Sequence, residues 1–134
     1  MEVNTEYLRG LLLAFEAAEG STTDISELKD RGFDFNEKEF LFHMRLLNDQ
    51  NFIECYCNTE LGYSRSVDGS GSWAVAPMRL TAAGHEFVAA LANEEVWSKV
   101  KDGLKNESMS TLWNISKQLL EGYAKKKAES LLGQ

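Results

Sequence analysis

The sequence has no hydrophobic run long enough to cross a membrane. Purely apolar stretches such as Leu11–Phe15 are short, far below the roughly 20 residues that a spanning helix needs. The first residues, Met1–Asn4, lack the positive charges that begin a secretory signal peptide. With 134 residues, of which 43% are hydrophobic and 26% charged, the chain suits one ordinary core with an appendage. We therefore expect a soluble cytoplasmic protein.

Cysteine and histidine occur only twice each. Cys55 and Cys57 lie two residues apart on a predicted strand, so both thiols face the same side. This spacing is awkward for a mutual disulfide. A zinc site would need two further ligands, and only His43 and His85 offer a nitrogen. We therefore predict two half-buried thiols in a reducing compartment, and no metal.

The sequence also lacks the usual signatures of an active site. No Gly-rich phosphate-binding loop precedes a predicted helix, and the serines of residues 64–72 have no histidine near them in sequence. His43 and His85 each allow two interpretations, a base or metal ligand and a hydrogen-bonded structural histidine. We favour the structural role for both, with His85 fixing its helix to the preceding loop. We expect no enzymatic activity and no cofactor.

Apolar residues recur at helical intervals in the first third of the chain, behind residues that favour helix N-caps. A helix, a short helix and a third helix in this order are typical of a helix-turn-helix arrangement. The predicted helices are Thr5 to about Glu19, capped by Asn4; Ile25 to about Asp30, capped by Asp24; and a third that starts after Asn36, with Glu39 at its third position, and continues to about Asp49.

The middle of the chain has the pattern of two strands joined by a long loop. Phe52–Cys57 has strong β propensity, residues 58–72 are rich in turn formers, and Trp73–Ala76 is again β-like. Thr81 then offers an N-cap for a helix that begins near Ala82. Three helices, a strand, a loop or wing, a second strand and a closing helix predict a winged helix-turn-helix domain over residues 1–92. We expect its core to contain Leu8, Leu12, Phe15, Leu28, Phe40, Met44, Leu47, Ile53, Leu80 and Phe87.

Residues 93–134 predict two further helices, which makes the fold class α+β and mostly α. Asn93 caps the first of them, and the second runs from about Ser110 to Leu132. Their apolar faces need a cover, which is either the winged helix or a second copy of the chain. We predict a homodimer through the broad face of the last helix, which carries Leu112, Trp113, Ile115, Leu119 and Tyr123.

These elements contain the residues on which a family resemblance rests: Arg79-Leu80-Thr81, Gly84-His85-Glu86-Phe87, His43, Leu46-Leu47, Phe52-Ile53-Glu54 and Trp97. From about Glu6 to Lys127 the chain resembles a widespread bacterial and phage-associated family catalogued as domain of unknown function 2513. The resemblance implies a winged-helix fold and an association with mobile or phage DNA, and it implies no activity. Such domains usually place Gly before the strand. This chain has Asn51 there, so we expect Asn51 in a left-handed conformation.

Positive charge is scarce in the predicted winged helix. The formal net charge of the chain is −7, and residues 1–93 hold seven Lys and Arg against fifteen Asp and Glu. Residues 94–134 hold seven Lys against six acidic residues. A protein that binds duplex DNA normally neutralises phosphates with Lys and Arg. The predicted domain therefore has no general electrostatic footprint for DNA.

The outward side of the third predicted helix is the candidate contact surface. It presents Lys38, Phe42 and Arg45, and the wing adds Ser64 and Arg65. The cations form a small positive strip of the kind that repressors of modest charge use on DNA. Phe42, with carboxylates beside it, instead favours a protein contact. A third interpretation is that Phe42 packs under the C-terminal helices.

Two functions from different classes therefore remain open. The fold favours a transcriptional-regulator-like DNA-binding protein of phage or prophage type. The alternative is a protein-interaction module, such as a phage-encoded inhibitor of a host nucleic-acid-binding defence complex, whose acidic surface imitates phosphate. The run Lys125–Lys127 is a further basic candidate, for which a solvated role is the simpler explanation.

Overall fold

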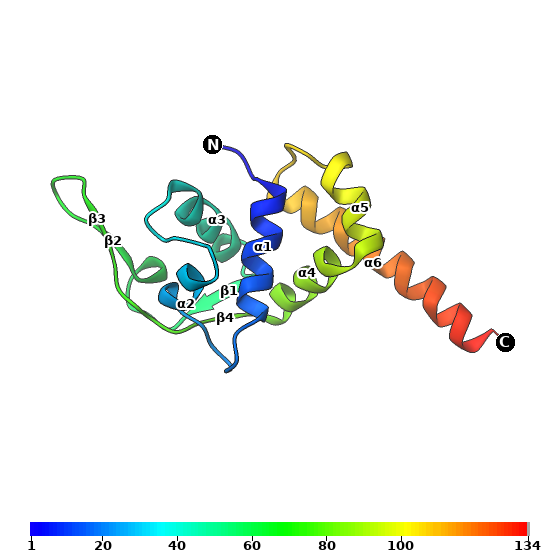
Figure 1. The fold of residues 1–134 in the computed structure, drawn as a ribbon. Coiled ribbons are helices and arrows are strands. Elements are labelled where there is room, and N and C mark those ends of the chain that lie inside the picture. The colour runs from blue at the N-terminus through cyan, green and yellow to red at the C-terminus, as the bar shows by residue number, and fades with distance from the viewer. Residues whose placement is uncertain (134) are drawn as a thin grey trace.

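The computed structural model describes residues 1–133 and has an α+β fold that is mostly helical (Figure 1). Two small antiparallel sheets, β1–β4 and β2–β3, lie among the helices. In chain order the elements are α1 (Thr5–Glu16), α2 (Ile25–Asp30), α3 (Lys38–Asp49), β1 (Ile53–Cys55), the 3₁₀-helix η1 (Glu60–Gly62), β2 (Tyr63–Arg65), β3 (Gly71–Trp73), β4 (Met78–Leu80), α4 (Ala82–Ala92), α5 (Glu94–Gly103) and α6 (Met109–Leu132).

Most helices start at the residues that the sequence predicts. The side chains of Asn4, Asp24, Thr81 and Asn93 each accept a hydrogen bond from a backbone N–H in the first turn of their helix, which satisfies a donor that has no intrahelical partner. The start of the third helix differs from the prediction. Its N-cap is Glu37, whose side chain makes no capping hydrogen bond, so α3 begins one residue later than predicted. The first helix ends at Glu16, before the predicted end.

The strands differ more from the prediction. Strand β1 pairs with β4, so that Ile53 lies opposite Leu80, and Thr23 forms a bridge to Met78 on the other side of β4. The predicted loop 58–72 contains η1, β2 and most of β3. The predicted strand Trp73–Ala76 is wrong, because Trp73 pairs with Tyr63 in the β2–β3 hairpin and β4 starts only at Met78.

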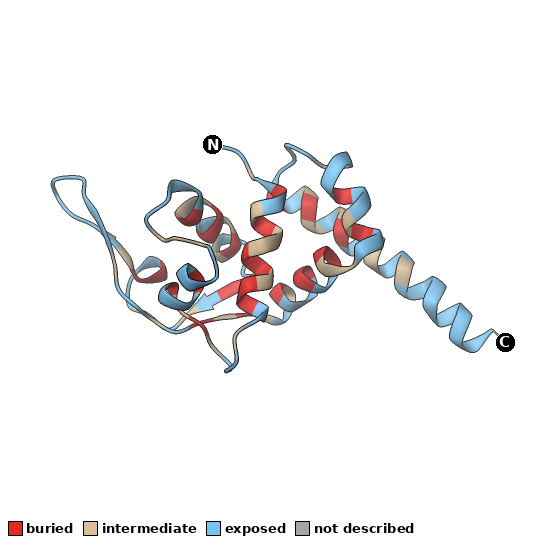
Figure 2. Cartoon of the chain, in the orientation of Figure 1, coloured by how far each residue is buried: buried red, intermediate tan, exposed pale blue. Residues whose placement is uncertain are grey.

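The core is continuous from the first three helices to the two C-terminal helices. All ten predicted core residues are buried, with exposed fractions of 5% or less. They pack together with Phe52 and Met78 and with residues of the last two helices. Figure 2 shows this core as buried segments of α1, α3, α4 and α5 that face one another. The members from α5 and α6 are Val96, Val100, Met109 and Leu112.

Helix α6 has two parts with different surroundings. Its first half packs on α4 and α5, and the Trp113 ring lies against the rings of Phe52 and Phe87, with centroids 5.4 and 5.3 Å away. Its distal half extends away from the body and is largely exposed (Figures 1 and 2). The sequence left two possible covers for the apolar face of this helix, and the first half of α6 is covered by its own chain. Within residues 1–133, no helix combines the length and apolarity that crossing a bilayer requires.

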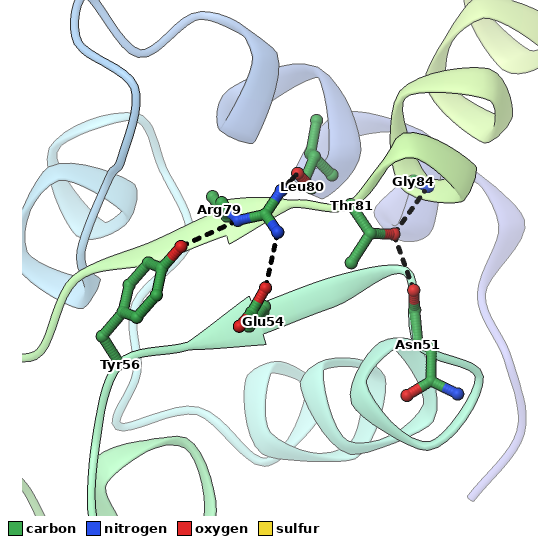
Figure 3. A network of polar contacts seen from close by, with 7 residues as sticks. All are labelled: Asn51, Glu54, Tyr56, Arg79, Leu80, Thr81 and Gly84. Carbon is green, nitrogen blue, oxygen red and sulfur yellow. Dashed lines mark hydrogen bonds and ion pairs between the residues drawn. The ribbon is translucent and has the colours of Figure 1, made fainter.

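The junction between β1 and α4 explains the Leu-Thr-x-x-Gly sequence (Figure 3). The Thr81 hydroxyl donates to the Asn51 carbonyl at 2.6 Å and accepts from the Gly84 N–H at 3.1 Å. Asn51 has φ 59°, the left-handed conformation that the sequence predicts. On the neighbouring strands, Arg79 donates to the Glu54 carboxylate at 2.6 Å and to the Tyr56 hydroxyl at 2.9 Å. One network thus ties the two strands to the start of α4.

Candidate functional site

A groove of about 590 Å³ lies between α3 and the β2–β3 hairpin. We call it the α3–hairpin groove. It contains most of the predicted contact residues together with aromatic side chains from both elements. Its lining consists of Met1, Phe35, Asn36, Glu37, Lys38, Leu41, Phe42, Arg45, Leu46, Asp49, Tyr63, Arg65, Gly71 and Trp73.

The pairing of the hairpin decides which of its side chains face this groove. Tyr63 lies opposite Trp73, and Arg65 lies opposite Gly71. Because successive strand residues point to opposite sides, these four share the face toward α3. Ser64 pairs with Ser72 on the other face, where their hydroxyls are 3.3 Å apart. Of the predicted contact residues, Lys38, Phe42, Arg45 and Arg65 therefore line one groove, and Ser64 does not.

Aromatic packing connects the hairpin to the rest of the domain. The Trp73 ring lies 5.4 Å from the buried Phe40 ring and 4.9 Å from the Tyr63 ring, measured between centroids. It also lies 6.3 Å from Phe35, in the segment before α3. Edge-to-face contacts of this kind stabilise a defined arrangement. The sequence analysis did not identify Trp73 as a site residue, because it was assigned to the wrong strand.

Arg45, the central cation of α3, is already paired within the chain. Its Nε donates to Glu60 Oε1 at 2.9 Å, and its guanidinium carbon lies 5.7 Å from the centre of the Tyr63 ring. Both side chains of the ion pair are 44% exposed, so the pair contributes at most about 1 kcal/mol to stability. Its larger effect is on charge, because a carboxylate neutralises the guanidinium. Glu60 comes from η1, and the sequence analysis missed it.

The remaining charges of the groove are mixed. Lys38 and Arg65 make no ion pair with any other residue among 1–133. Glu37 and Asp49 line the same groove. Two unpaired cations with two carboxylates close by leave no net positive charge among these side chains, whereas phosphate binding requires several cations together.

Phe42 is half-buried on α3 and lies edge-on to the His43 ring, with centroids 5.2 Å apart. It lines the groove, to which α5 and α6 contribute no side chain. The interpretation that Phe42 packs under the C-terminal helices is therefore wrong. Those helices pack on α4 and on each other instead. Phe42 keeps part of its ring available to a binding partner.

The two histidines differ in burial and in the hydrogen bonds of their rings. His43 is buried, its Nε2 accepts from the Asn4 N–H at 3.0 Å, and its Nδ1 donates to the Glu39 carbonyl at 2.7 Å. Burial lowers its pKa from the usual value, which keeps the ring neutral. This is the predicted structural role. His85 is exposed, and within the described part of the chain its imidazole makes no hydrogen bond, so its predicted locking role is wrong.

The prediction for the cysteines is also wrong, because Cys55 and Cys57 form a disulfide with each other. The reason is that β1 ends at Cys55 and the chain then bends. An extended strand separates residues two apart by about 6.6 Å. The bend brings the two Cα atoms to 5.5 Å, within the range of disulfides. Among residues 1–133 no group of three or more His, Cys, Asp or Glu side chains is placed to hold a metal ion.

The predicted dimer residues are divided by the packing of α6. Leu112 is buried and Trp113 covers Phe52 and Phe87 of the same chain. Ile115, Leu119 and Tyr123 are half-buried. Of the lysine run, Lys126 has its ammonium nitrogen 3.8 Å from a Glu95 carboxylate oxygen. The chain itself thus covers the first part of the predicted dimer face.

The family can now be stated. Residues 2–110 match the model of a family described as "Hypothetical protein (DUF2513)". The chain belongs to this family. The DUF2513 match includes every lining residue of the α3–hairpin groove except Met1, together with the β1–α4 junction, and it stops at the beginning of α6. No curated protein and no solved structure gives a significant match.

Proposed function

We propose that this chain is a non-enzymatic winged-helix protein of phage or prophage type that binds another protein through the α3–hairpin groove. The order of the elements supports the winged-helix assignment. Thr23, β4 and β1 form three adjacent antiparallel segments, α2 and α3 form the helix-turn-helix, and the β2–β3 hairpin takes the place of the wing. In this arrangement α3 corresponds to the recognition helix of DNA-binding relatives of the fold.

The ion pair between Arg45 and Glu60 carries the choice of a protein partner over DNA. A helix that reads DNA needs cations that are free to meet phosphates and base edges. Here the central cation of α3 is held by a carboxylate at 2.9 Å. Phe42 and Trp73 line the same groove, and aromatic residues are enriched where protein interfaces are most buried. The chemistry of the groove therefore fits a protein better than a phosphate backbone.

Two matched variants test this proposal. Phe42→Asp places a carboxylate inside the groove, and Ser64→Asp places the same charge on the opposite face of the hairpin. Each variant and the native chain serve as bait in cross-linking to host extract, followed by quantitative mass spectrometry. We expect a host protein that the native chain and Ser64→Asp retain equally and that Phe42→Asp loses at least tenfold. Titration with that purified protein then gives the affinities.

A titration of random duplex DNA, followed by fluorescence anisotropy from 50 to 200 mM salt, tests the competing function. Non-specific DNA-binding proteins have dissociation constants of about 10⁻⁴ to 10⁻⁶ M at physiological salt. We expect no binding in this range. Micromolar binding that Lys38→Ala with Arg65→Ala abolishes, and that Phe42→Asp leaves unchanged, would replace the proposed protein-binding function with DNA binding.

A further inference from the structure

We propose that Cys55 and Cys57 form a reversible thiol–disulfide site whose state controls the Arg45–Glu60 pair. The substrate class is a small dithiol or its cyclic disulfide. This inference goes beyond the proposed function, because it concerns the groove itself and requires no binding partner. It rests on the accessibility of the disulfide, on the small part of the fold that depends on it, and on its position just before Glu60.

The disulfide is accessible. Both cysteines are half-buried, and they line an open hollow of about 390 Å³ together with Thr59 and Glu60. A small dithiol can therefore approach the sulfurs without unfolding of the chain. The residues that follow, Asn58 and Thr59, are exposed.

Little of the fold depends on the disulfide. It closes a loop of only three residues, and the stabilisation that a disulfide gives the folded state increases with the length of the loop it closes. Strand β1 is held independently by its pairing with β4 and by the buried Ile53. Tyr56, between the two cysteines, donates its N–H to the Pro77 carbonyl at 2.8 Å, and its hydroxyl accepts from Arg79 (Figure 3). These contacts persist when the disulfide opens.

The segment just beyond the disulfide carries Glu60. Cys57 Sγ lies 3.1 Å from the Thr59 carbonyl oxygen; because a disulfide sulfur has no hydrogen, this is a packing contact that sets the path of the chain. Thr59 precedes η1, whose first residue is Glu60. Leu61 is buried and keeps η1 attached. Opening the disulfide therefore loosens residues 57–60, which follow the anchored Tyr56, and leaves the rest of η1 in place.

The consequence for the groove is a change of charge. In the oxidised chain Glu60 neutralises Arg45. In the reduced chain the freed segment withdraws Glu60, and the Arg45 guanidinium joins Lys38 and Arg65 as a third unpaired cation. The reaction balances as a thiol–disulfide exchange. The dithiol gives two electrons and two protons, the bond between the cysteine sulfurs breaks, two thiols form, and the reductant becomes a cyclic disulfide.

The first test measures the site directly. The purified full chain is equilibrated with dithiothreitol and its cyclic disulfide at ratios that span several decades. Free thiols are alkylated and counted by mass spectrometry, and circular dichroism monitors the fold. We expect one transition between chains with no alkyl group and chains with two, at unchanged helical content. Two alkyl groups even in excess cyclic disulfide, or disulfides only between chains, would overturn the site.

The second test follows Arg45 by the NMR signal of its Nε–H group, assigned through Arg45→Lys. We expect this signal to move on reduction. The variant Cys55→Ser with Cys57→Ser should give the reduced signal under all conditions. Glu60→Gln, which removes the partner and keeps the disulfide, should abolish the response to reduction. An Arg45 signal that is identical in the oxidised and reduced chains would overturn the coupling while leaving the proposed protein-binding function untouched.

Discussion

Gly84 lies where α4 meets Phe52, the residue just before β1, and a side chain at this position would collide with the backbone. A Cβ at Gly84 would collide with the Phe52 carbonyl oxygen, which also accepts from the Thr81 N–H at 2.9 Å. The backbone at Phe52 is therefore held between Gly84 and Thr81. We expect Gly84→Ala to lower the free energy of unfolding by about 1–3 kcal/mol, as overpacking typically does. Urea denaturation followed by circular dichroism measures this change.

Gly122 is the matched control. It lies within α6, and a Cβ added there would meet no atom within 4 Å. Gly122→Ala should therefore leave the free energy of unfolding unchanged or raise it by up to about 1 kcal/mol, because Ala favours the helix. If Gly84→Ala were as stable as the native chain, the contact between α4 and Phe52 would not be the constraint described.

His43 predicts a dependence of stability on pH. Burial lowers the pKa of the folded chain's His43, whereas the unfolded chain binds this proton below about pH 6.5. The unfolded state then holds more protons, so the free energy of unfolding falls as pH drops below about 6.5 toward the lowered pKa. We expect His43→Gln to remove this part of the pH dependence, and His85→Gln, at an exposed position, to retain it. Urea denaturation between pH 5 and 8 compares the three chains.

At the scale of elements, the helices were predictable and the hairpin was not. Helix starts depend on local capping by residues such as Thr81 and Asn93, which a sequence displays directly. The left-handed Asn51 was predictable from the family resemblance, because such domains usually have Gly at this position and Asn is one of the few other residues that adopt the conformation. The β2–β3 hairpin depends on the pairing of Tyr63 with Trp73 across a Gly- and Ser-rich turn. Such pairing is non-local, and Trp73 also fits a strand with the residues that follow it.

The candidate site shows the same division between local features, which the sequence predicts, and features that depend on distant parts of the chain, which it does not. Helical periodicity alone places Lys38, Phe42 and Arg45 on one exposed face of α3, and the structure confirms that they share a groove. Glu60 and the Cys55–Cys57 disulfide depend on how the chain bends after β1. No local pattern in the sequence specifies that bend. The sequence therefore predicts which residues of α3 lie together, and it gives no sign of Glu60 or of the disulfide beside it.

The two halves of α6 predict different effects of truncation. Tyr123 is half-buried, and residues 124–133 are exposed. A chain ending at Gly122 should keep its free energy of unfolding within about 0.5 kcal/mol, as for exposed surface changes. A chain ending at Ser108 loses Trp113 and uncovers Phe52 and Phe87, so we expect it to be destabilised by several kcal/mol or to fail to fold. Urea denaturation of both truncated chains checks this, and equal stability of the two would contradict the packing role of Trp113.

At the scale of the whole molecule, the β2–β3 hairpin and the distal half of α6 lie at opposite ends of the body (Figure 1). No residue of α6 lines the α3–hairpin groove. The two surfaces can therefore be tested separately, because a truncation of α6 leaves the groove intact. A chain ending at Gly122 should bind the partner of the groove as tightly as the full chain does.

The same truncation decides the oligomeric state. Because Leu112 and Trp113 are covered within the chain, the predicted homodimer now depends on Leu119 and Tyr123, extended by Leu131 and Leu132, which are 71% and 84% exposed. These residues offer little apolar surface, so we expect a weak dimer. Sedimentation velocity from 1 to 200 µM should show the full chain shifting from monomer to dimer, and the chain ending at Gly122 remaining monomeric because it lacks Tyr123 and both terminal leucines. A full chain that stays monomeric throughout this range would exclude the dimer, and the distal half of α6 would then be an exposed helix that the stability of the domain does not require.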